Sequence, residues 1–154
     1  EREELLEHIR SQQIKDVVFI TGDIHTFIAG DVRTELGAGE TVAVEFVGGS
    51  ITSTNLGELE FNAGGGIVIP GNDANPHTNP AIIDALRGFN PWVDQADFDH
   101  HGYATVRASR SEFECTLKRL ETIKRPTRSM LTTDGFRYQL ERGQKSIKGV
   151  NGPS

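Results

Sequence analysis

Cysteine is almost absent from this chain: Cys115 is the single one among 154 residues. One cysteine excludes an intrachain disulfide and a cysteine-based zinc cluster. It lies in Phe113-Glu114-Cys115-Thr116-Leu117, where apolar and polar residues alternate as in a half-buried strand. We therefore expect Cys115 to be a small buried hydrophobic residue and not a nucleophile.

The chain also lacks an excess of basic residues and any long apolar run. Its formal net charge is −6, which argues against a nucleic-acid partner. No run of about 20 apolar residues is present, so no membrane span is expected. With 36% hydrophobic and 25% charged residues, the composition is that of a globular domain. The first residue is Glu1 and not Met, so we expect an N-terminal region to be missing.

The feature richest in information is an apolar run, Val17-Val18-Phe19-Ile20, that leads into Gly22-Asp23-Ile24-His25. Such a run predicts a strand buried on both faces. Carboxylate and imidazole are metal-ligating groups, and a strand end would fix both on a rigid scaffold. Asp23 and His25 are therefore candidate metal ligands. The alternative is that Asp23 only caps a turn and His25 is an ordinary loop residue.

Local patterns predict a β-rich α+β chain and exclude a helical bundle. An amphipathic helix is expected at residues 1–13, and a second one begins at Pro80 with Asn79 as its N-cap and Gly88 at its end. Residues 57–79 are rich in Gly, Asn and Pro and predict a long loop. Strands are expected at 17–22, 27–34, 41–47, 103–108, 113–120 and 136–141, with a hairpin over 27–47 that packs one face on the core.

Three blocks in this order resemble the C-terminal half of the PhoD-like alkaline phosphatase family. They are Gly22-Asp23-Ile24-His25, then Glu45-Phe46 with Ser50-Ile51-Thr52-Ser53, then Asn90-Pro91 followed by Gly102-Tyr103. The resemblance covers residues 1–142, and 143–154 is expected to be a flexible tail. It implies part of a calcineurin-like four-layer sandwich, in which two β-sheets are flanked by helices. It also implies an extracellular or periplasmic enzyme that hydrolyses phosphate mono- or diesters with calcium and iron.

The resemblance assigns roles residue by residue. Asp23 matches a metal ligand, and His25 matches a metal ligand or catalytic phosphate contact. Support of the site or contact with substrate is implied for Ser50, Ser53 and Asn90. His101, which precedes the strand expected at 103–108, is a further candidate for this role, and the alternative is a structural histidine. Trp92 stands where some members carry His, so no ligand is expected there.

The Asp-rich motifs of the family's N-terminal half, Gly-Asp-x-x-Tyr and Asp-Asp-His, do not occur in this chain. We therefore expect a fragment that is inactive alone and that self-associates through a surface left by the missing half. The alternative is a non-catalytic β-rich binding module on the same scaffold, with loop 57–79 as its recognition surface. The sequence does not separate a monoesterase from a phospholipase-type diesterase.

Overall fold

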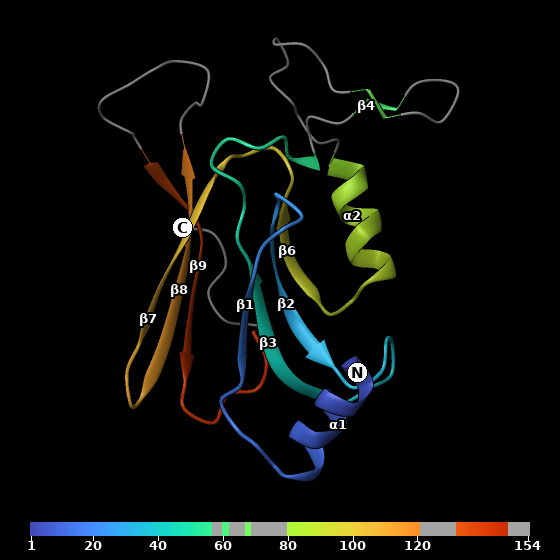
Figure 1. Cartoon of the computed structure of the whole chain (residues 1–154), viewed down its shortest axis with the longest axis vertical. Helices are drawn as coiled ribbons and strands as arrows, with labels where there is room; N and C mark the ends of the chain where they lie inside the picture. Colours follow the sequence, from blue (N-terminus) through green and yellow to red (C-terminus); the bar gives the residue numbers. More distant parts are fainter. Residues whose placement is uncertain (57–59, 62–66, 69–79, 121–131, 148–154) are drawn as a thin grey trace.

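The computed structural model describes residues 1–56, 60–61, 67–68, 80–120 and 132–147. In chain order the elements are α1 (Arg2–Ser11), β1 (Val18–Thr21), β2 (Phe27–Arg33), β3 (Thr41–Val47), β4 (Glu60–Phe61), β5 (Ile67–Val68), α2 (Pro80–Phe89), β6 (Val93–Asp97), β7 (Gly102–Ala108), β8 (Glu112–Leu120) and β9 (Thr132–Glu141) (Figure 1). The predicted helices and strands are all present, and β9 begins before the predicted 136. Most of the expected loop 57–79 lies outside the described residues, and so does Asn79, the expected N-cap of α2.

Two sheets form the body of the fold. The first has the strand order β1-β3-β2-β6, in which β1 runs parallel to β3 and the other neighbours are antiparallel. The second is the antiparallel sheet β7-β8-β9, and β4 and β5 form a separate two-stranded pair. The two main sheets face each other (Figure 1). The helices α1 and α2 lie on the side of the first sheet that is away from the second. This confirms a β-rich fold of two sheets with flanking helices, and both described helices lie on one side of it.

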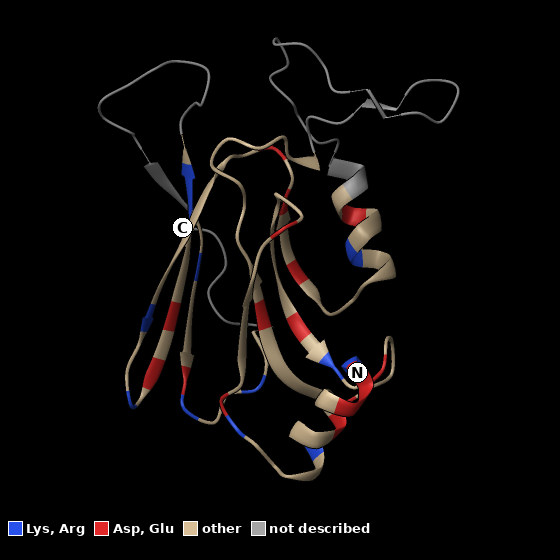
Figure 2. Cartoon of the chain, viewed as in Figure 1, with Lys and Arg blue, Asp and Glu red and all other residues tan. Residues whose placement is uncertain are grey.

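The main core fills the space between the two sheets. Phe46 of β3 stacks on Phe113 of β8 with ring centroids 5.9 Å apart, and contacts Tyr138 of β9 at 5.3 Å. Cys115 is completely buried in this core, as predicted. The outer face of the second sheet is charged, with ion pairs such as Arg137 to Glu114 at 2.6 Å (Figure 2). A sheet with one apolar and one charged face gives the alternation seen in the sequence.

The prediction that the first strand is buried on both faces was wrong. β1 pairs only with β3, so it forms an edge of the sheet, and Ile20 is 56% exposed. The interior position belongs to β3, which is buried on both faces except near Thr41 and Glu45, and not on one face as expected. An apolar run in the sequence shows that the side chains are apolar, but it does not reveal how many strands lie beside it.

Residues 143–147, expected to start a flexible tail, are held against the first sheet. Ile147 is fully buried, and its N–H donates to Asp31 Oδ1 at 3.0 Å. The Ser146 hydroxyl donates to the other oxygen of the same carboxylate at 2.7 Å. Asp31 is itself buried, so these bonds satisfy a carboxylate that would otherwise be destabilising. Residues 148–154 lie outside the described residues.

Gly88 does not end the second helix, which continues to Phe89. Among the described residues, no helix is both long enough and apolar enough to cross a membrane.

Candidate functional site

Three loops meet where several strands of the first sheet end. The register pairs Thr21 with Val47, Val47 with Ile28, and Phe27 with Asp97. The ends of β1, β3 and β6 and the start of β2 therefore lie together. We call this the site edge and define it as residues 22–26, 48–56 and 98–101. It contains every predicted site residue except Asn90.

Asp23 lies in a strained turn directly after β1. Its φ is +74°, and the Ile24 N–H donates to the Gly22 carbonyl at 2.9 Å across it. This is a γ-turn with a positive central φ, the rarer and more strained of the two γ-turn forms. The Asp23 side chain is exposed. Sparsely populated backbone conformations of this kind occur at functional sites.

His25 also has a left-handed backbone, with φ +58°, and its side chain is half-buried. The ring atom Nδ1 lies 2.9 Å from the Thr54 carbonyl oxygen. Since a carbonyl oxygen only accepts hydrogen bonds, Nδ1 carries the proton and donates it. In the neutral ring, Nε2 then keeps its lone pair and can bind a metal. The hydrogen bond to Thr54 therefore fixes the orientation of the His25 ring.

Ser50 connects the loop after β3 to the second sheet. Its hydroxyl donates to the Ser53 carbonyl and lies 3.2 Å from Nδ1 of His101. The Ser50 carbonyl accepts from the Gly102 N–H at 2.8 Å, at the start of β7. His101 is buried, with 7% of its surface exposed. The structure thus brings Ser50, Ser53 and His101 together.

Asp97, the last residue of β6, is a buried residue next to the site edge that the sequence analysis missed. Its carboxylate accepts from Arg119 Nε at 2.6 Å and lies 2.9 Å from His100 Nδ1. It also accepts from the backbone N–H groups of Asp99 and His100, both at 3.1 Å. Burial acts to raise the pKa of Asp97, but the His100 hydrogen bond and the Arg119 charge lower it to about 2. The Asp-x-x-His spacing is a local signal that could have indicated the turn. No sequence signal indicates Arg119.

Asn90 lies at the opposite end of β6 and not at the site edge. Its backbone N–H and its side-chain Nδ2 both donate to the Leu86 carbonyl, at 2.8 and 2.9 Å. These bonds cap the C-terminal end of α2, where carbonyl groups lack partners within the helix. The structure therefore gives Asn90 a role in ending the helix and starting β6.

A metal centre needs several converging ligands, and the described residues do not supply them all. Within that part of the chain, no group of three or more His, Cys, Asp or Glu side chains could hold a metal ion. Asp23 and His25 provide one carboxylate and one imidazole. Both are groups that transition metals accept as ligands.

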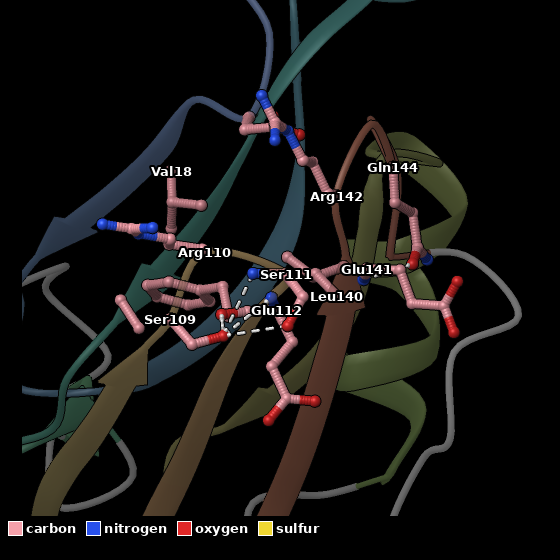
Figure 3. Close-up of a pocket in the computed structure, with 12 residues that line it drawn as sticks. Val18, Ser109, Arg110, Ser111, Glu112, Leu140, Glu141, Arg142 and Gln144 are labelled. Carbon is pink, nitrogen blue, oxygen red and sulfur yellow. Dashed lines mark hydrogen bonds and ion pairs between the residues drawn. The ribbon is translucent and has the colours of Figure 1, made fainter.

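Two of the hollows on the described surface lie at the two ends of β1. A groove of about 380 Å³ on the outer face of the first sheet adjoins the Asp23 turn and includes Gly22, Ile24 and Trp92 in its lining. A cavity of about 180 Å³ lies at the far end, between the start of β1 and the β7–β8 turn. Figure 3 shows Arg110 and Arg142 among the residues that line this cavity. Only the first hollow adjoins the site edge.

Comparison with known proteins identifies the family. The model of the PhoD-like phosphatase family matches residues 1–117. A solved structure of PhoD matches with a TM-score of 0.70 and 19% identity, over 99% of this chain and 25% of that one. At this identity the similarity shows the fold, and this chain spans about a quarter of the length of PhoD. No curated protein matches this sequence. The family match covers most of the chain, which therefore belongs to the PhoD-like phosphatase family.

Proposed function

We propose that this chain forms part of the active site of a metal-dependent phosphoric ester hydrolase, an alkaline phosphatase or phosphodiesterase. The observation that carries the proposal is the left-handed backbone at both Asp23 and His25, directly after β1. Non-glycine residues held in such backbone conformations cluster at active sites, and they persist only where the surrounding structure fixes them. Gln13 and Asp16 have a positive φ as well, but they do not bring two ligating side chains together at a strand end. Family membership supplies the reaction class.

The Asp23 carboxylate and His25 Nε2 would hold the metal. A bound metal would neutralise phosphate oxygens and lower the pKa of a water or hydroxyl nucleophile. Calcium prefers oxygen ligands such as the Asp23 carboxylate, whereas iron accepts imidazole as well. His25, with its ring fixed by Thr54, would either complete the metal shell or contact the phosphate. Ser50, Ser53 and His101 would support the loop behind His25.

The remaining ligands would come from outside the described residues. The chain matches only 25% of the PhoD chain, and its described part holds no complete ligand set. We therefore propose that the chain alone has no turnover and works within a longer protein. By analogy with the family, that protein would be extracellular or periplasmic.

A free strand edge is the proposed place for self-association of the isolated chain. The outer edge of β1 has no neighbouring strand in the described residues, and Ile20 is 56% exposed beside it. Ile24 and Ile51, exposed by 43% and 49%, lie in loops of the site edge. Unpaired strand edges with exposed apolar side chains promote association between chains.

The second candidate function is a binding module without catalysis. It is favoured by the absence of a group of three metal-ligating side chains in the described part of the chain. A module of this kind has no need for metal. Metal binding at Asp23 therefore separates the two proposals.

The test is metal content and affinity of the chain and of two variants. The chain is loaded with Ca²⁺ or Fe³⁺, passed through a desalting column and measured by elemental analysis. We expect Asp23→Ala to lose the bound metal and Asp84→Ala, a change at an exposed aspartate of α2, to retain it. Metal retained by Asp23→Ala would refute the assigned ligand. Absence of metal from the native chain would mean that the chain alone lacks a complete site, and the same variants would then be compared in the longer protein.

A further inference from the structure

The loop after β3 is tied to both sheets through short polar contacts. On one side, Thr54 accepts the Nδ1–H of His25 at 2.9 Å. On the other, Ser50 contacts His101 at 3.2 Å, and the His101 carbonyl accepts from the Leu120 N–H of β8 at 2.8 Å. A continuous set of contacts therefore runs from the second sheet to the predicted ligand His25.

The donors in this set can be assigned from the chemistry of each group. The Ser50 hydroxyl has one hydrogen, and it is committed to the Ser53 carbonyl, which only accepts. The same hydroxyl oxygen must therefore accept from Nδ1 of His101, which carries a proton. Nδ1 of His25 also carries a proton, because Thr54 offers only a carbonyl oxygen. Both rings are thus protonated on Nδ1.

We propose that Ser50 and His101 are positioning residues that hold the Thr54 carbonyl against His25. This contact keeps the proton of His25 on Nδ1 and leaves Nε2 as the ligand atom. The fixed form matters because a free histidine ring favours the proton on Nε2, which would block metal binding there. The metal role of Nε2 rests on the proposed function, whereas the fixed tautomer does not.

The first experiment reads the His25 ring directly in the metal-free chain. Two-bond ¹H–¹⁵N spectra above pH 8 distinguish a neutral ring with the proton on Nδ1 from one with it on Nε2. We expect the Nδ1–H form in the native chain and a shift toward Nε2–H in Ser50→Ala and in His101→Ala. His101→Asn should preserve the native form, because its amide places an N–H donor near the position of Nδ1.

Matched controls separate this role from a loss of stability. Ser11→Ala also removes a serine hydroxyl bonded to a carbonyl, that of His8 at 3.3 Å in α1. It should leave the His25 spectrum unchanged, and the exposed His8 ring serves as an internal reference. Far-UV circular dichroism confirms that each variant is folded. An Nε2–H form in the native chain, or an unchanged His25 ring in folded Ser50→Ala and His101→Ala, would overturn the proposal.

The second experiment measures affinity for Mn²⁺ alone by electron paramagnetic resonance. Loss of groups that orient a metal ligand weakens binding by roughly 10- to 100-fold. We expect at least a tenfold loss for Ser50→Ala, none for Ser11→Ala, and rescue in His101→Asn relative to His101→Ala. Equal affinity of Ser50→Ala and the native chain would count against the positioning role. A native chain that binds no Mn²⁺ would count against metal binding by Asp23 and His25 in this chain alone, and the ring spectra would still decide the tautomer.

Discussion

Replacement of Asp97 by asparagine tests whether one buried carboxylate stabilises the site edge. Its side chain is 6% exposed and contacts both Arg119 and His100. Asparagine has nearly the shape of a protonated aspartic acid but cannot ionise. The variant therefore imitates the native protein with this carboxyl group neutral. The difference in stability between the two proteins measures what the negative charge contributes.

The size and pH dependence of this difference follow from the pKa of Asp97. The pKa falls from an ordinary 3.8 to about 2 in the folded chain. One pKa unit corresponds to about 1.4 kcal/mol, so the charge contributes about 2 kcal/mol to the free energy of unfolding. Because the folded pKa is lowered, the contribution is complete above the unfolded value. The contribution is lost as the pH falls through the pKa of the folded state, and about 1 kcal/mol remains at pH 3.

Urea unfolding followed by the fluorescence of Trp92, the single tryptophan, provides the assay. We expect Asp97→Asn to be about 2 kcal/mol less stable than the native chain at pH 7, and the difference to shrink by about half at pH 3. Asp84→Asn on the surface of α2 should show no difference at either pH. A difference that stays the same from pH 7 to pH 3 would refute the reasoning.

Three further predictions concern the core, the chain end and the open edge. Burial raises the pKa of the Cys115 thiol to about 12. The folded chain should therefore not react with a thiol reagent at pH 8, whereas the urea-unfolded chain should react once. Ile147→Ala should lower the free energy of unfolding by about 3 kcal/mol in urea titrations, because it empties a buried site. By contrast, Val106→Ala on an exposed face should change it by less than about 0.5 kcal/mol. Ile20→Lys should reduce self-association in size-exclusion chromatography, and a sharp monomer peak of the native chain at high concentration would contradict the proposed edge contact.

Most of the secondary structure could be predicted because its causes are local. Alternation of apolar and polar residues indicates β7, β8 and β3, and helical spacing of Leu6 and Ile9 indicates α1. The position of β1 at the edge could not be predicted, because it depends on which strand pairs with β3. The positions of Ser146 and Ile147 depend on the buried carboxylate of Asp31, more than 110 residues earlier.

The same distinction between local and distant causes applies to the residues of the candidate site. Asp23 and His25 could be predicted because two ligating residues follow a strand within one short motif. Asp97 gains its importance from Arg119, a residue of another sheet, and no pattern in the chain connects the two. Asn90 was placed by resemblance alone, and the structure uses its amide to end α2.

Backbone conformation adds the argument that sequence could not supply. Asp and His tolerate a positive φ better than most residues do, so either could occupy a turn without any chemical role. At this strand end, however, both have a positive φ, and neither strained position is occupied by glycine, which would adopt it without strain. Gly22 stands directly before them and does not take the strained position. Gln13 and Asp16 also have a positive φ, so this conformation alone does not identify a site. What distinguishes Asp23 and His25 is that two ligating side chains take it within three residues, at the end of one strand.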